Sequence, residues 1–158
     1  MKKMFLVLAM VACSHFAFAQ SAAAVINAFK DKPQAEYMEM PKAMLKLALS
    51  GSEDPEAAGF LQRVDCMKML SVPASDKETQ ESFLAMVRTM DQGGYEKMID
   101  MTQDGETIVV FTKSNGDVYS EMVMAMAEKD ECEMLCLEGS MNLEDLDMLQ
   151  QFGGGGDE

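Results

Sequence analysis

The chain has no tryptophan and a single histidine, His15. His15 falls inside an N-terminal segment that we expect to be removed, so the mature protein would have no imidazole group. Without histidine there is no serine–histidine–aspartate triad and no base of that kind to activate a cysteine nucleophile. The sequence also has no glycine-rich phosphate loop and no G-x-S-x-G elbow. The enzyme classes built on those templates are therefore excluded.

Basic residues and long apolar runs are also scarce. The chain has 13 Lys and Arg against 27 Asp and Glu, a net charge of −14, and loss of Lys2 and Lys3 with the N-terminal segment makes it more negative. A protein this acidic repels phosphate backbones, so we expect no nucleic acid as a partner. Beyond the N-terminal segment no apolar stretch reaches the roughly 18 residues that a membrane helix needs, so we expect no transmembrane span.

The N-terminal segment has the pattern of an export signal. Lys2 and Lys3 give it a positive start, and residues 5–12 form an apolar run too short to cross a bilayer. Ala17 and Ala19 provide small residues at the positions that signal peptidase requires. We expect residues 1–19 to be a signal peptide cleaved after Ala19, with the mature protein exported to the periplasm or elsewhere in the bacterial cell envelope.

A second processing route remains open at Cys13. Residues 10–13 (Met-Val-Ala-Cys) loosely resemble a bacterial lipobox, although Met10 stands where such boxes usually carry leucine. Processing there would leave a lipid anchor on Cys13. Either route predicts a cell-envelope protein.

The remaining pattern predicts a single α+β domain over residues 20–152, followed by a flexible, Gly-rich acidic tail at 153–158. Asp104-Gly105 and Asn115-Gly116 are hairpin signals, and they predict an antiparallel four-stranded meander. We expect one or two N-terminal strands to extend this sheet and helices to pack on at least one face. The predicted strands are 35–40, 61–72, 96–103, 106–113, 118–127 and 132–138. The predicted helices are 21–30, 41–51, one from Ser75 to about 92, and one from Asn142, with an acidic loop at 52–59.

Both faces of the predicted meander are apolar, whereas a sheet with one wet face would alternate apolar and polar residues. Either the helices or another molecule must cover the second face. With two-residue loops, we expect that face to gather a candidate interaction surface. Its members are Phe111, Met122, Met124, Met126 and Leu135.

Methionine is the compositional anomaly, with 18 residues in the chain. Flexible thioethers fill cores well, and the spacing of the methionines suits core positions. Thioethers are also soft ligands that select Cu(I), and Cys132, Met134 and Cys136 on one strand face would add to them. A soft-metal protein binding Cu(I) or Ag(I) is therefore an alternative to packing, although no metal ligand can be assigned.

Three cysteines remain beyond the signal: Cys66, Cys132 and Cys136. Cys132 and Cys136 lie four residues apart on one predicted strand, about 13 Å at strand rise, beyond the roughly 7 Å limit for a disulfide. Cys66 could pair with Cys132 or Cys136 if its strand adjoins theirs. Three free thiols are the alternative.

Carboxylates are abundant, so a carboxylate-dependent hydrolase is a further alternative. Asp130, Glu131 and Glu133 cluster near a turn, and Glu144, Asp145 and Asp147 cluster near the last helix. Such chemistry needs a cleft that raises one pKa and usually aromatic residues to hold a sugar. The simpler interpretation is a solvated turn and a helix start favoured by negative charge.

Three segments together resemble a known family. They are EYMEMPKAMLKLA (36–48), DGETIVVFTKSNGDVYSEMVMAM (104–126) and CEMLCLEGSMNLEDL (132–146). The resemblance covers residues 22–150 and is to the exported bacterial proteins of domain of unknown function 4252. It implies an exported single domain and no catalytic, cofactor or metal residues. We expect a non-catalytic binding or self-assembly domain without a cofactor, whose partner is another protein or further copies of itself.

Overall fold

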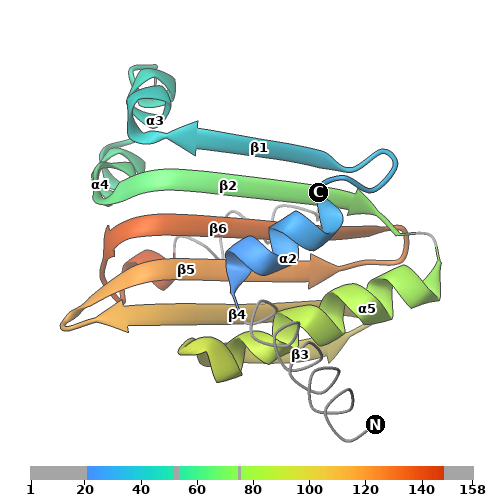
Figure 1. Ribbon diagram of the computed structural model, residues 1–158. Helices are drawn as coiled ribbons and strands as arrows, with labels where there is room; N and C mark the ends of the chain where they lie inside the picture. Colours follow the sequence, from blue (N-terminus) through green and yellow to red (C-terminus); the bar gives the residue numbers. More distant parts are fainter. Residues whose placement is uncertain (1–20, 52–53, 75, 148–158) are drawn as a thin grey trace, which may run out of the picture.

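The computed structural model describes residues 21–51, 54–74 and 76–147. The expected signal peptide, Cys13 and the 153–158 tail lie outside these residues. Six antiparallel strands form one sheet in the order β1-β2-β6-β5-β4-β3 (Figure 1). The strands are β1 Glu36–Pro41, β2 Val64–Pro73, β3 Glu96–Gln103, β4 Glu106–Asn115, β5 Val118–Ala127 and β6 Glu131–Met141. Strands β3 to β6 are the predicted meander, and β1 and β2 extend it, so the predicted α+β fold is confirmed.

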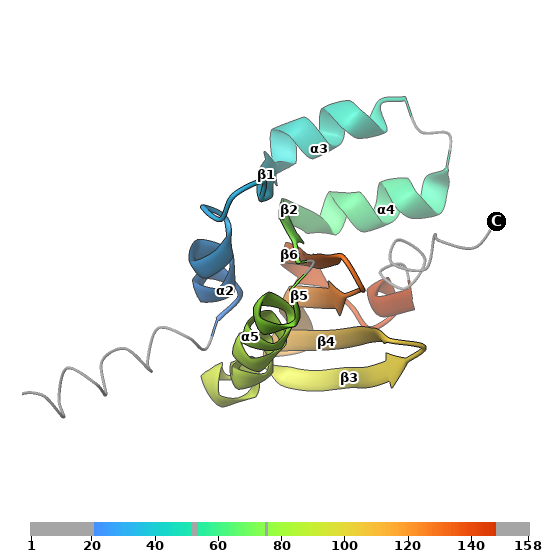
Figure 2. The same cartoon turned by 90° about the vertical axis from the view of Figure 1, so that its right-hand side faces the viewer.

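Helices lie on both sides of this sheet. Helix α2 (Ala22–Phe29), helix α5 (Lys77–Arg88) and the short helix η1 (Thr89–Gly93) cover one face, and Phe29 packs edge-on against Phe83 with ring centroids 5.4 Å apart. Helices α3 (Lys42–Leu49) and α4 (Pro55–Arg63) lie on the other side, at one end of the strands (Figure 2). Within the described ranges, no helix has the length and apolar character to cross a bilayer.

Helix α4 replaces part of a predicted loop and the first residues of a predicted strand. The sequence analysis expected a loop at 52–59 and a strand from Leu61, but the chain is helical from Pro55 to Arg63 and the strand begins at Val64. The Asp54 side chain accepts hydrogen bonds from the N–H groups of Glu56 and Ala57, at 2.9 and 3.5 Å. Proline at the first helical position needs no such partner, so Asp54-Pro55 is a helix start.

The start of α5 also differs from the prediction. Asp76 accepts a hydrogen bond from the N–H of Thr79 at 2.7 Å and caps the helix. Ser75, at which the helix was expected to begin, lies outside the described residues.

A β-bulge changes the predicted faces of the sheet. Asn115 pairs with Val118 across a two-residue turn, but the register shifts between Lys113 and Ser114. An extra residue on one strand moves every side chain beyond it to the opposite face relative to its partner strand. Phe111 therefore pairs with Val123 instead of sharing a face with Met122. The prediction that Phe111 belongs to the methionine-rich face was wrong for this reason.

Gly139 is required where the second strand enters the sheet. It pairs with Val64, directly after α4, and a bulge separates this pair from the rest of β2. A Cβ atom on Gly139 would overlap the carbonyl oxygen of Arg63 and lie 3.0 Å from the Cα of Val64. Both neighbours are backbone atoms, which cannot move aside without displacing α4 or β2.

We predict that Gly139→Ala destabilises the fold by about 2 kcal/mol or more, because it forces backbone apart. The matched change Gly59→Ala, inside α4, places its Cβ 3.9 Å from an Arg63 side-chain nitrogen. That change should stabilise the fold by about 0.5–1 kcal/mol, because glycine is a poor helix former. Urea unfolding of both variants measures the two effects, and equal stability of the variants would contradict the account.

Candidate functional site

A row of apolar side chains crosses the sheet on the face opposite α2 and α5. Each member pairs directly with the next across neighbouring strands, and directly paired residues share a face. We call it the central row: Met38, Met69, Leu135, Met124, Val110 and Ile99. It includes one residue from every strand, so an unbroken apolar band runs from one edge of the sheet to the other.

A second row lies beside the central row, nearer α3 and α4. Its members, in strand order, are Met40, Met67, Leu137, Met122, Thr112 and Glu96. Leu45 of α3 and Phe60 of α4 pack into a cluster with Met122 and Leu137. Met122 and Leu137 are fully buried. We call this the covered row, since its middle forms a second small core.

The third row lies on the other side of the central row and is not covered by helices of the described chain. Its members are Glu36, Ser71, Glu133, Met126, Ile108 and Met101, and we call it the rim row. Above the central and rim rows lie two adjacent hollows of about 630 and 380 Å³ that share Met124 in their linings. We call the two hollows together the methionine groove.

Methionines are unusually exposed along this groove. Met38 is 47% exposed, Met69 is 42% and Met98 is 39%, whereas Met124 between them is nearly buried. Met126 and Leu135 are half-buried. A thioether side chain of this kind adapts its shape to a partner, so the groove is suited to binding rather than to solvent contact.

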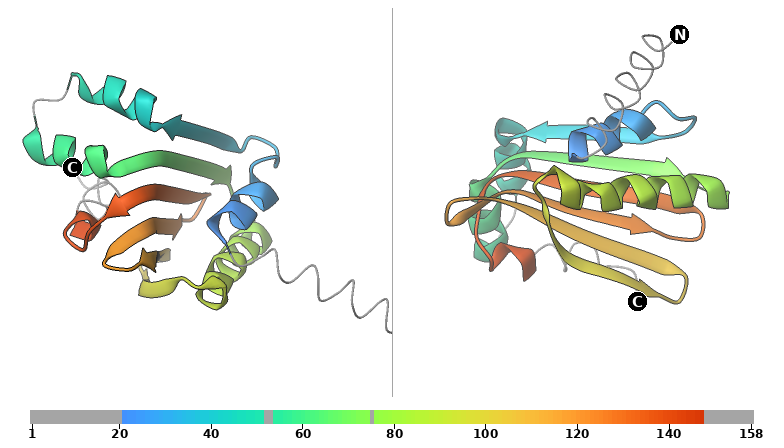
Figure 3. Two further views of the ribbon diagram at one scale, coloured as in Figure 1. Left: turned by 60° about the vertical axis from the view of Figure 1, so that its left-hand side comes forward. Right: turned by 60° about the horizontal axis from the view of Figure 1, so that its bottom comes forward.

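One wall of the groove is held by an ion pair between a half-buried arginine and a buried aspartate. Arg63, the last residue of α4, donates to the Asp145 carboxylate, with Nε–Oδ2 at 2.9 Å, and Asp145 is 1% exposed. The same carboxylate accepts from the N–H of Asn142 at 2.8 Å. The pair joins α4 to the turn that carries Leu143 and Leu146, so both segments lie at the same end of the strands (Figure 3).

Carboxylates dominate the polar lining. Glu36, Glu131 and Glu133 line the larger hollow, and Glu144 and Asp147 line the smaller one, while none of the lining residues of either is Lys or Arg. Burial raises the pKa of Glu133, and the negative charges of Glu131 and Glu128 raise it further. The groove is therefore an apolar floor with an acidic border.

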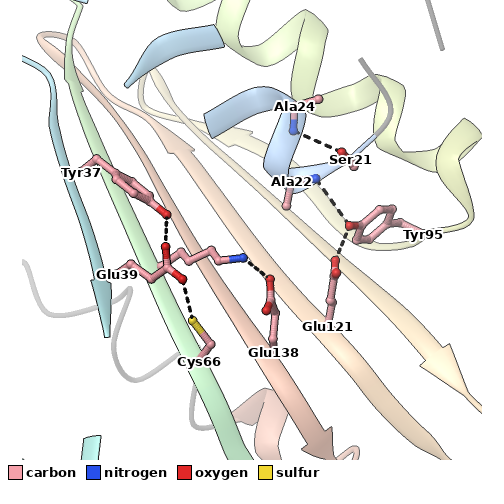
Figure 4. Close-up of polar contacts among 10 residues, drawn as sticks. Ser21, Ala22, Ala24, Tyr37, Glu39, Cys66, Tyr95, Glu121 and Glu138 are labelled. Carbon is pink, nitrogen blue, oxygen red and sulfur yellow. Dashed lines mark hydrogen bonds and ion pairs between the residues drawn. The ribbon is translucent and has the colours of Figure 1, made fainter. Parts of the chain in front are cut away.

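A polar corner occupies the other face of the sheet, beside α2 (Figure 4). It comprises Tyr37, Glu39, Cys66, Lys68 and Glu138. The Tyr37 hydroxyl donates to Glu39 at 2.9 Å, the Cys66 thiol donates to the same carboxylate at 3.6 Å, and Lys68 forms an ion pair with Glu138. The Cys66–Glu39 bond joins the edge strand β1 to β2, and the Lys68–Glu138 pair joins β2 to β6.

Nearby, Tyr95 links α2 to the sheet. Its hydroxyl donates to Glu121 and accepts from the N–H of Ala22 at 3.5 Å (Figure 4). Burial and the bond to Glu121 raise the pKa of Tyr95, so the phenol stays protonated at neutral pH. The arrangement anchors the start of α2.

The pKa values of the polar corner favour a structural role. Burial, followed by the charges of Glu138 and Glu39, raises the pKa of Cys66, which keeps the thiol protonated and a poor nucleophile. Burial and Glu39 raise the pKa of Tyr37. Burial lowers the pKa of Lys68, but its hydrogen bond and attraction to Glu138 outweigh this and raise it. All three pKa values move further above neutral pH, whereas a group that transfers protons in catalysis needs a pKa near neutral.

The possible disulfide of Cys66 with Cys132 or Cys136 is not formed, and the alternative of three free thiols is the one that the structure has. Cys132 pairs with Val72, six residues along β2 from Cys66, which is about 20 Å at strand rise. Cys136 pairs with Lys68 and is only a diagonal neighbour of Cys66, at a typical separation of about 7–8 Å. Burial raises the pKa of Cys132 to about 11 and also raises that of Cys136.

The predicted interaction surface is only partly brought together. Met124, Met126 and Leu135 lie in the methionine groove, whereas Met122 is in the covered row. Phe111 lies on the opposite face, fully buried, with its ring 6.4 Å from that of Tyr95. Sequence reasoning missed Met38 and Met69 as members of the surface. Met38 and Met40, and likewise Met67 and Met69, are two residues apart and so share one face of their strands. This spacing is the sequence signal that could have placed them on the same surface.

The sulfur atoms considered as metal ligands lie on opposite faces of the sheet. Cys132, Met134 and Cys136 lie in the core beneath α2 and α5, on the face opposite the exposed methionines. Within residues 21–51, 54–74 and 76–147, no group of three or more His, Cys, Asp or Glu side chains is arranged to hold a metal ion.

Comparison with protein families gives one result. The family model described as domain of unknown function (DUF4252) matches residues 29–149, most of the chain. The chain belongs to this family. No curated protein and no solved structure matches it. The expected resemblance is thus confirmed, and the family assigns no activity to any residue of the groove.

We predict that Glu133→Gln raises the melting temperature at pH 7. The folded chain raises the pKa of Glu133 above its unfolded value, so its ionisation costs the folded state free energy once the pH exceeds that unfolded value. The advantage of the variant should therefore shrink as the pH falls to about 4, where the carboxyl is largely protonated in both states. Thermal unfolding followed by circular dichroism at both pH values measures this difference.

The control is Glu96→Gln, an exposed glutamate of β3. Its effect on the melting temperature should vary less with pH. A Glu133→Gln variant that is less stable than the wild type at pH 7 would contradict the expected cost of the buried charge.

Proposed function

We propose that this protein is a non-catalytic binding domain of the bacterial cell envelope that takes up a partner on its methionine groove. The observation that carries the proposal is the central row, six apolar residues in direct cross-strand pairing. Met38 and Met69 are exposed and Leu135 and Ile99 are half-buried, while Met124 and Val110 are buried between them. A folded chain normally covers such a band, because exposed apolar surface is costly in water. The partner is another protein or a second copy of the chain.

The proposed location rests on the sequence. Residues 1–19 have the charge, apolar run and small residues of a signal peptide, and Cys13 offers a lipid anchor as a second route. Either route delivers the groove to the envelope.

The proposal predicts position-dependent crosslinking in cells. We expect the photoreactive amino acid p-benzoylphenylalanine in place of Met69, in the groove, to give a discrete covalent adduct on irradiation. The same amino acid in place of Glu81, which is exposed on α5 on the opposite face, should give none. The adducts are resolved by gel electrophoresis and mass spectrometry of the envelope fraction.

Introducing Met124→Glu together with the photoreactive residue at position 69 should abolish the adduct, because a charge would then lie in the centre of the groove. An adduct that forms equally at positions 69 and 81, or at neither, counts against a binding role for the groove. An adduct with the mass of two chains identifies self-assembly as the form the binding takes.

A second candidate function is soft-metal binding, and one observation favours it. Met38 pairs with Met69 and Met40 pairs with Met67 on the same face of β1 and β2. Four thioethers thus lie side by side, and thioethers select Cu(I) and Ag(I). The site would bind the ion as cargo in the exported compartment.

Calorimetric titration with Ag(I) distinguishes this candidate. If the four methionines form a site, the wild type binds Ag(I) with a micromolar or lower Kd, and the double variant Met38→Leu/Met69→Leu loses at least about tenfold in affinity. Leucine preserves volume and apolar character, so the fold and any protein-binding role should persist. Binding that is absent, or equal in both proteins, removes the candidate.

The carboxylate-dependent hydrolase gains less support. Asp145, one of the carboxylates considered for it, is bound to Arg63 within a buried ion pair. Glu131 and Glu133 lie at the border of a groove whose floor is formed mainly by methionine and leucine side chains, which cannot hydrogen-bond a sugar.

A further inference from the structure

We propose that the partner segment bound by the methionine groove is a basic amphipathic α-helix of another protein. This inference rests on the proposed binding function and specifies its partner. Three features carry it: the shape of the open band, the chemistry of its floor, and the sign of the charge along its border.

The shape of the open band matches one helix laid across the strands. The central row crosses five inter-strand gaps, about 24 Å in total, which equals the length of about 16 helical residues. Its exposed members, Met38 and Met69, lie at the β1–β2 end, and Met124 and Val110 are buried in the part nearer β3. In the other direction only the central and rim rows are open, and these lie about 7 Å apart along the strands. A helix about 10 Å wide therefore fits across the sheet, whereas no second helix fits beside it.

The walls give the groove its direction. Phe60 of α4 and the turn with Leu143 and Leu146 close the strand ends on one side. On the opposite side no helix of the described residues closes the groove, and Glu36, Glu131 and Glu133 form its border. A bound helix would lie between an apolar wall and a line of carboxylates.

The floor suits an apolar helix stripe. Met38, Met69 and Met124 present flexible, polarisable side chains that can repack around leucine, isoleucine or phenylalanine residues of different shape. A helix places such residues at intervals of three and four positions along one face. This is the helix-in-groove mode of recognition, in which the apolar stripe supplies affinity.

The acidic border of the groove favours a partner helix whose polar face is positively charged. Among the described residues, those that line the two hollows include five carboxylates and neither Lys nor Arg. Burial raises the pKa of Glu133, and the negative charges of Glu131 and Glu128 add to this, so a further negative charge beside it would be unfavourable. Lysine or arginine beside the apolar stripe of the partner would relieve this repulsion, whereas a second copy of this chain, with a net charge of −14, would increase it.

Strand addition at the sheet edges is a poorer fit. Edge strand β1 has six residues and ends at Pro41, and edge strand β3 has a register shift between Lys97 and Ile99. Short strands, proline and bulges are the features by which sheet edges avoid pairing with another strand.

Two designed peptides test the inference directly. Both have 18 residues with leucine at intervals of three and four; the remaining positions are lysine in one and glutamate in the other. We expect the lysine peptide to bind the full-length protein at least about tenfold more tightly than the glutamate peptide at low ionic strength, with the difference falling as salt is raised. Fluorescence anisotropy of labelled peptides measures both affinities.

Matched variants locate the binding. Glu36→Gln/Glu133→Gln should weaken the lysine peptide about three- to tenfold, while Glu78→Gln/Glu81→Gln on α5, which changes the net charge equally, should have little effect. Met69→Gln should also weaken it, unlike Met44→Gln, since Met44 is 53% exposed on α3 outside the groove.

Each other outcome overturns the inference in a recognisable way. Equal binding of both peptides, weakened by Met69→Gln, would show that charge does not select the partner, while the proposed function stands. Equal loss in the two glutamate pairs would show attraction to net charge instead of the groove. A dimer in light-scattering chromatography that the peptide disrupts would assign the groove to a second copy. If no peptide binds, the inference fails, and crosslinking at position 69 decides the proposed function separately.

Discussion

The cross-strand register of the sheet is the constraint on which the rest of the structure depends. It places Met38, Met69 and Met124 in one row and assigns Met122 to a neighbouring row that α3 and α4 cover. A single extra residue in β5, opposite Lys113 and Ser114, decides that β4 contributes Val110 to this face and Phe111 to the other. Had that bulge been absent, the groove would contain an aromatic ring, and the core beneath α2 and α5 would lose one.

The two faces of the sheet are apolar but are used differently. Beneath α2 and α5, Phe83, Phe111 and Val123 form a closed core, which the edge-on contact of Phe29 with Phe83 helps to fill. On the opposite face the helices close only one end of the strands. There the Arg63–Asp145 pair holds α4 against the turn that follows β6. The helices of the described residues thus cover one face of the sheet and part of the other, and the groove lies on the remainder of that second face.

Much of the fold could be predicted from the sequence because its signals are local. Asp104 and Gly105 adopt positive φ angles of 54° and 88°, as a tight turn requires, and β3 and β5 have the predicted bounds. The bulge at Lys113, the helix start at Asp54-Pro55 and the missing Cys66 disulfide depend on how distant segments meet, which local pattern does not report. The candidate site was accordingly half predicted: Met124, Met126 and Leu135 are in the groove, but Met38 and Met69 join it only through pairing of β1 with β2 and β6.

The methionine side chains on the floor of the groove can also be oxidised reversibly. Sulfur in exposed side chains such as Met38 and Met69 is oxidised readily, and each sulfoxide places a strongly polar S=O group where an apolar contact had been. Because repair enzymes reduce sulfoxides back, the surface would pass between water-avoiding and water-seeking states without any change of backbone. If the protein is exported as proposed, binding by the groove would then depend on the oxidant load of its environment.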